Sequence, residues 1–144
     1  MSITRTPFVL AALFLSQFAL FAASPLIVND VTKLNPIPVR GIIVPQTIQE
    51  IAKAVKTHEG PISIGGGRFS MGGQTATEGA LQIDMRSFDK IVAFSKEKKV
   101  ITVQAGITWR KIQEFIDTQD LSLQIMQTYA NFTVGGSLSV NCHG

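Results

Sequence analysis

The sequence predicts an α+β fold with a βαβ subdomain followed by a mostly antiparallel subdomain. Short β-branched runs at 41–44 and 61–64 flank a helical pattern that begins at Ile48. A strand–helix–strand unit of this kind closes most naturally with parallel strands. Two later runs, 90–94 and 100–104, are separated only by a charged tip. Such a short connection favours an antiparallel pair.

The composition is that of a globular protein. Apolar residues make up 45% of the chain and charged residues 16%, which permits a core and argues against disorder. The length of 144 residues allows one domain. The 13 basic residues are scattered and the net charge is +3, so we expect no nucleic-acid partner. Cys142 is the single cysteine, which excludes an internal disulfide.

Residues 1–24 carry the pattern of a signal peptide or membrane anchor. Arg5 precedes an apolar stretch, 8–23, that is slightly short for a full membrane span of about 20 residues. Pro25 would follow the cut and makes a poor cleavage site, so retention as an anchor stays open, as does a buried core helix. We therefore expect a membrane-anchored or exported protein, periplasmic or secreted, with membrane association through residues 8–23.

The first subdomain is expected to start after a linker. Residues 25–37 are predicted to be this linker, because Pro36 and Pro38 favour extended backbone. After the strand at 41–44, Thr47 is predicted to cap the helix, with Glu50 completing a capping box. The apolar residues of that helix fall on one face, which we expect to be buried.

The remaining elements follow from similar signals. Thr108 is predicted to cap a helix over 109–118. Strands are expected at 80–84, 90–94, 100–104 and, as a short final strand, at 121–126.

A glycine-rich stretch, residues 65–74, follows the strand at 61–64; we call it the glycine loop. Successive glycines expose their N–H groups and can form a concave set of donors for a phosphate or pyrophosphate. We expect φ > 0 or close phosphate approach at these glycines. A dinucleotide fingerprint would need glycine in place of Ser70, and a P-loop would need Gly-Lys-Ser/Thr. The alternative is a flexible surface loop.

Four blocks, at 62–74, 81–85, 100–106 and 133–144, occur in an order that carries a family resemblance. Together they resemble the FAD-binding domain of the vanillyl-alcohol oxidase/p-cresol methylhydroxylase superfamily, the PCMH-type domain. The resemblance covers residues 38–144 and is nearest to decaprenylphosphoryl-ribose oxidase and the aldonolactone oxidases. It implies FAD as the cofactor.

The resemblance also implies site residues. Backbone N–H groups of the glycine loop would hold the pyrophosphate, and a second segment, 133–137, would complete the cradle. His143 would lie near the flavin and the substrate as the one catalytic candidate; a core histidine is the alternative. An ordinary turn is the alternative for Gly135 and Gly136. The implied cofactor-binding residues are Gly65, Gly66, Gly67, Arg68, Phe69, Ser70, Gln74, Thr133, Val134, Gly135, Gly136, Ser137 and His143.

Arg68 stands where many members of the superfamily have the histidine that bonds covalently to the flavin. Arginine cannot form that link, and Cys142 does not match the cysteine of bicovalent members. We therefore expect non-covalent FAD, with the Arg68 guanidinium as a fixed positive charge near the pyrophosphate.

The function implied is that of the N-terminal part of an FAD-linked oxidoreductase. It would transfer hydride to flavin from the CH–OH group of a small molecule such as a sugar alcohol, aldonolactone or hydroxy acid. The substrate domain of the family is missing from these 144 residues, so we expect them to be inactive alone. The alternative is a non-enzymatic remnant that binds FAD weakly or not at all.

Overall fold

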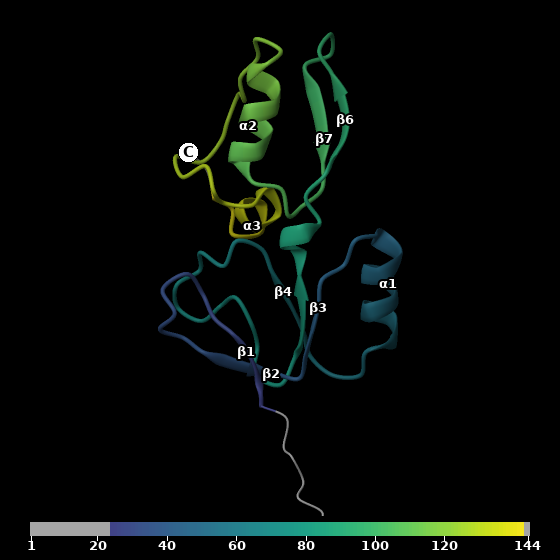
Figure 1. Cartoon of the computed structure of the whole chain (residues 1–144), viewed down its shortest axis with the longest axis vertical. Helices are drawn as coiled ribbons and strands as arrows, with labels where there is room; N and C mark the ends of the chain where they lie inside the picture. Colours follow the sequence, from purple (N-terminus) through teal and green to yellow (C-terminus); the bar gives the residue numbers. More distant parts are fainter. Residues whose placement is uncertain (1–23, 143–144) are drawn as a thin grey trace, which may run out of the picture.

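The computed structural model describes residues 24–142 (Figure 1). The predicted leader up to residue 23 and the catalytic candidate His143 lie outside the described residues. Among the residues that are described, no helix has the length and apolar character needed to cross a membrane.

The first part of the fold is a small parallel sheet. Its strand order is β3 (Gly41–Ile43), β5 (Leu81–Asp84), β4 (Ile62–Gly65), and both outer strands run parallel to β5. The helix α1 (Ile48–Thr57) connects β3 to β4. The predicted parallel closure is confirmed, with β5 inserted between the two strands of the βαβ unit.

The stretch predicted as a linker forms a hairpin instead. Strands β1 (Leu26–Val28) and β2 (Ile37–Val39) pair antiparallel, with Val28 opposite Ile37. Val28 and Val39 are buried, and this burial pins both strands to the domain. Pro38 is compatible with β2 because β2 pairs on one side only, with β1, so its other edge needs no N–H donor.

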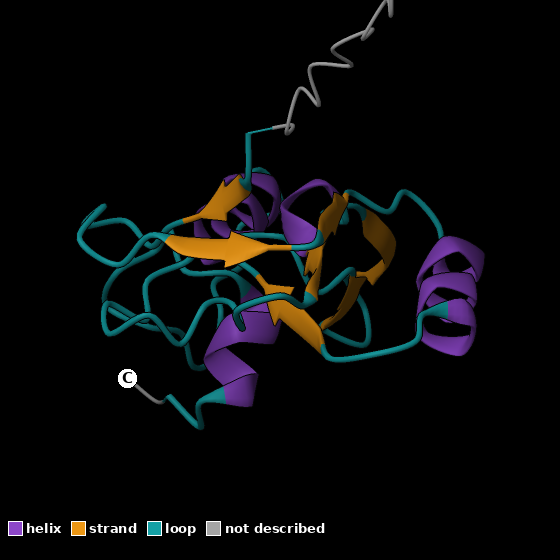
Figure 2. Ribbon diagram, turned by 90° about the horizontal axis from the view of Figure 1, so that it is seen from below, coloured by secondary structure: helices purple, strands orange, loops and turns teal. Residues whose placement is uncertain are grey.

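The helix α1 has the predicted cap but not the predicted buried face. The Glu50 N–H donates to Oγ1 of Thr47 at 3.2 Å, and the Gln46 N–H donates to the Glu50 carboxylate at 2.7 Å. No residue of α1 is buried, and Ile48 and Val55 are 69% and 52% exposed. Figure 2 shows the reason, because α1 stands at one edge of the molecule, to the right.

The second part is a hairpin covered by a helix. The 3₁₀ turn Met85–Ser87 leads to β6 (Ile91–Ser95) and β7 (Val100–Val103), which pair antiparallel as predicted. The helix α2 (Trp109–Asp117) begins at the predicted cap Thr108. The core of this second part consists of Ile107, Ile112 and Ile116. The residues packed against this core include Ile91, Phe94, Ile101 and Val103.

The short helix α3 (Val134–Ser139) lies where the two parts meet (Figure 1). The final strand predicted at 121–126 is wrong, since these residues form an irregular connection. Leu121 and Leu123 pack against the core, whereas Ile125 is 66% exposed. Leu121 and Leu123 therefore pack against the core that includes α2, and the segment does not pair as a strand.

The exposed apolar side chains lead to a prediction about solution behaviour. Residues 25–144 produced alone are expected to aggregate, because Leu138, Ile48 and Ile64 are 73%, 69% and 65% exposed and the sheet edges are open. Size-exclusion chromatography and a thermal melt test this. A monomer with a sharp cooperative transition would contradict it.

Candidate cofactor site

A cavity of about 630 Å³ lies between the glycine loop and α3. It brings together segments separated by more than fifty residues, because β4 ends beside the N-terminus of α3. Of the residues predicted to bind cofactor, Val134 does not line it and packs instead against the core around Ile112. His143 is not described. The predicted residues that do line the cavity are Gly65, Gly66, Gly67, Arg68, Phe69, Ser70, Gln74, Thr133, Gly135, Gly136 and Ser137.

The glycines allow the glycine loop and segment 133–137 to pack closely against each other. This reason for glycine differs from the expected ones, positive φ or close approach of a phosphate. A Cβ on Gly66 would collide with Oγ1 of Thr133, and one on Gly135 would come within 2.9 Å of the Ala105 carbonyl oxygen. None of the glycines at 65–67 and 135–136 has a positive φ; in the glycine loop that conformation belongs to Arg68 (φ 61°) and Gly73 (φ 81°). Of the two alternatives expected at these glycines, positive φ is therefore wrong, and close approach of a phosphate stays a prediction.

The two segments differ in the hydrogen-bond donors that they leave available. The N–H of Val134 donates to Ile107 and that of Gly135 to Ala105, each through the carbonyl oxygen. The Gly136 N–H donates to Oγ1 of Thr133 at 3.3 Å. By contrast, within the described residues no hydrogen bond uses the N–H groups of residues 67–70. The glycine loop therefore offers the free hydrogen-bond donors. The N–H groups at the start of α3 are already bonded within the protein, and this segment packs against the loop through Thr133.

Arg68 is the one charged side chain among the described residues that line the cavity. Its Nη2 donates to the Asp84 carboxylate at 2.8 Å, and Arg86 donates to the same carboxylate at 2.6 Å. Burial would raise the pKa of Asp84, but the hydrogen bonds and charges of Arg86 and Arg68 hold it below its usual value. The three side chains carry a net charge of +1, which favours an anionic ligand.

Two buried donors near the cavity have no partner among the described residues. They are Nε of Arg68 and Oγ1 of Thr75, whose side chain is 7% exposed. Burying a donor without an acceptor costs about 1–3 kcal/mol. These atoms, together with the free N–H groups at 67–70, fit a ligand that supplies several acceptor oxygens, as a pyrophosphate does.

The rest of the lining is apolar and aromatic. Ile51 comes from α1, Ile64 and Ile83 from the parallel sheet, and Met85 from the 3₁₀ turn that follows β5. Phe69 packs edge-to-face on Phe132 and Tyr129, with ring centroids 4.9 and 5.2 Å apart. A cavity with a polar, positive end and apolar walls suits a molecule that combines a phosphate with flat rings.

Sequence reasoning missed three supporting residues. Asp84 holds Arg68, Thr75 offers a buried hydroxyl, and the Trp109 indole N–H donates to Oγ of Ser137 at 3.0 Å. Only Asp84 had a sequence signal, as an acidic residue that directly ends a strand.

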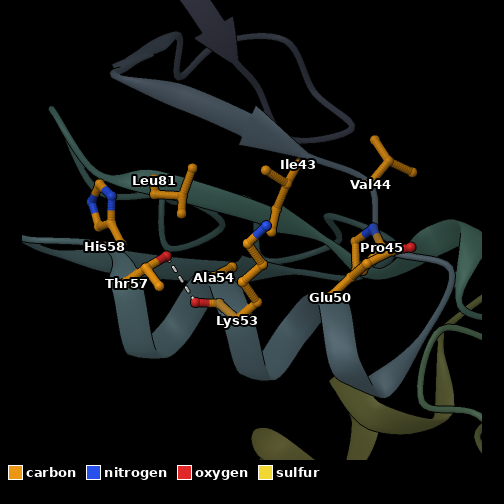
Figure 3. A pocket seen from close by; sticks show the side chains of 9 residues that line it. All are labelled: Ile43, Val44, Pro45, Glu50, Lys53, Ala54, Thr57, His58 and Leu81. Carbon is orange, nitrogen blue, oxygen red and sulfur yellow. Dashed lines mark hydrogen bonds between the residues drawn. The ribbon is translucent and has the colours of Figure 1, made fainter.

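A second cavity, of about 440 Å³, lies apart from the glycine loop between α1 and β3 (Figure 3). Its walls include Ile43, Val44 and Leu81, with Lys53 and His58 at its rim. It contains none of the predicted site residues.

A comparison with known protein families matches residues 39–144 to the FAD binding domain family. The chain belongs to this family. FAD is accordingly its cofactor, as the sequence predicted.

Three relatives are named as dehydrogenases or oxidases. Mitochondrial L-galactono-1,4-lactone dehydrogenase of Arabidopsis thaliana is 27% identical over 121 residues, covering 81% of this chain and 20% of the relative. L-gulonolactone oxidase of Mus musculus is 26% identical, covering 67% and 22%. Mitochondrial D-lactate dehydrogenase [cytochrome] of Arabidopsis thaliana is 26% identical, covering 72% and 19%. The chain thus spans about a fifth of the length of these proteins.

Solved structures share the fold. Cholesterol oxidase from Brevibacterium sterolicum superposes with a TM-score of 0.64 at 21% identity, covering 82% of this chain and 24% of the oxidase. Alkyldihydroxyacetonephosphate synthase gives 0.57 at 21% identity, covering 73% and 20%. These similarities confirm the mixed architecture of parallel and antiparallel sheets expected for a PCMH-type domain.

Proposed function

We propose that the chain is the N-terminal part of an FAD-linked oxidoreductase that takes hydride from a CH–OH group. The substrate class proposed is an aldonolactone, sugar alcohol or hydroxy acid. The names of the relatives support it, since they include two lactone enzymes and a lactate dehydrogenase. When bound, FAD supplies the acceptor for the hydride.

One observation carries the cofactor part of the proposal. The free N–H groups at 67–70 line the same cavity as the positively charged Arg68 side chain. In this arrangement the glycine loop would hold the pyrophosphate, and Thr75 and Ser137 would add hydroxyl donors. Phe69 and Phe132 would exclude water from the apolar end.

Several parts of the proposal rest on sequence alone. His143 is proposed near the flavin and the substrate, where a histidine can exchange a proton with a hydroxyl group. Residues 8–23 are proposed to direct the protein to a membrane or out of the cytoplasm.

The test of the proposal is an absorbance spectrum of the protein purified from its complete gene, followed by reduction with candidate lactones and hydroxy acids. Flavin bands that bleach on addition of substrate support it. A folded protein that contains no flavin and takes up none would favour the non-enzymatic alternative.

The way in which FAD is attached to the protein gives a separate prediction. FAD is expected to be released by acid or heat precipitation, because arginine at position 68 cannot form a histidyl bond to the flavin. The yellow chromophore should remain in the supernatant. Flavin fluorescence that migrates with the denatured polypeptide on a gel would contradict this.

A further inference from the structure

The turn between β1 and β2, residues 29–36, has a defined internal structure; we call it the hairpin turn. Asp30 is only 4% exposed, and its carboxylate accepts hydrogen bonds from the Thr32 N–H at 2.8 Å and from Nδ2 of Asn35 at 2.7 Å. The Asn29 side-chain oxygen accepts from the Asn35 N–H at 3.2 Å. These bonds tie the two ends of the turn together.

The hairpin turn donates hydrogen bonds to the glycine loop at two points, the carbonyl oxygens of Arg68 and Met71. The Val31 N–H donates to the carbonyl oxygen of Arg68 at 3.0 Å, and Nδ2 of Asn35 donates to that of Met71 at 3.1 Å. Figure 1 shows the blue turn beside the teal loop.

The contacts coincide with the unusual backbone of the loop. Arg68 has φ 61°, a conformation that a residue with a side chain adopts only when its surroundings hold it there. The bond from Val31 fixes the Arg68 carbonyl directly. Between the anchors at Arg68 and Met71 lie Phe69 and Ser70, whose N–H groups are among the free donors of the cavity.

We propose that Asp30 and Asn35 are positioning residues that hold the glycine loop in the shape that presents its N–H groups to the cofactor phosphates. This inference rests on the proposed FAD binding, and it adds a role for a segment that precedes the matched FAD-binding region. A donor set fixed before binding loses less conformational entropy on binding than a mobile loop does, so it binds more tightly.

The test uses Asn35→Ala in the protein made from its complete gene. The variant should bind FAD at least about tenfold more weakly, and the amides of residues 67–73 should exchange with solvent faster in the FAD-free protein. The matched control is Leu34→Ala in the same turn, whose side chain is 79% exposed and should change neither quantity. Thr32→Val removes a hydroxyl donor to Asp30 without changing a residue that contacts the glycine loop. It should also weaken FAD binding and speed amide exchange in the loop.

The outcomes separate this inference from the proposed function. If the wild-type protein is folded but binds no FAD, the proposed function fails and the inference fails with it. If wild type binds FAD and the Asn35→Ala protein binds it equally well, only the inference is overturned, whatever the exchange rates. Should Asn35→Ala not fold, an unchanged FAD affinity in Thr32→Val would overturn it.

Discussion

Valine in place of Gly66 is expected to weaken FAD binding by about 10- to 100-fold. Its Cβ would collide with Oγ1 of Thr133 and would lie 3.4 Å from Cβ of that residue. Thr133 cannot yield freely, because it is buried and its hydroxyl caps α3 through Gly136. Overpacking of this kind costs about 1–3 kcal/mol, and separation of the two segments would widen the cavity where the ligand is held.

The measurement is the dissociation constant of FAD, with thermal unfolding recorded in parallel. Gly79→Ala is the matched control. Gly79 has φ 68°, so alanine there is strained, but no atom lies within 4 Å of its new Cβ and the residue does not line the cavity. The control should therefore lose some stability and keep its FAD affinity. Full flavin content in Gly66→Val would mean that the loop is only a surface turn.

Local signals in the sequence predicted most of the fold. Thr47 and Thr108 start α1 and α2 as expected, because a cap depends on a side chain and the N–H two or three residues later. The hairpin of β6 and β7 is similarly local. Predictions failed where a distant partner decides the outcome. Within the described residues 24–142, nothing buries the apolar stripe of α1, and Leu121 and Leu123 pack against the core that includes α2 instead of forming a strand.

The same contrast between local signals and distant partners applies to the candidate site. Composition and resemblance selected the residues of the glycine loop and of segment 133–137, and nearly all of those described line one cavity. The reason for glycine at position 66 depends on contact with Thr133, sixty-seven residues away, which no local pattern contains. Likewise, Val31 holds the Arg68 backbone and Asp84 holds the Arg68 guanidinium, and neither pairing leaves a signal in sequence spacing.

The Asp84→Ala substitution is expected to lower the free energy of unfolding by about 3 kcal/mol at neutral pH, near the lower end of the range for breaking a buried ion pair. The Asp84 and Arg68 side chains are only 6% and 16% exposed, so removal of the carboxylate leaves a largely desolvated guanidinium unpaired. Arg86 is 53% exposed and can turn to solvent, which limits the loss. Arg68 would also lose its fixed position, so FAD should bind more weakly.

Chemical denaturation of wild type and variant, repeated between pH 7 and pH 2, measures the effect. Because the folded-state pKa of Asp84 is lowered, its stabilisation is complete above the ordinary aspartate pKa of about 4 and disappears as the pH falls through the lowered value. The difference between the two proteins should shrink over the same range. Asp89→Ala is the matched control: its ion pair with Lys111 has the same length of 2.8 Å, but the two side chains are 36% and 50% exposed. An exposed pair contributes less than about 1 kcal/mol, so equal losses in the two variants would show that Asp84 is not a buried anchor for Arg68.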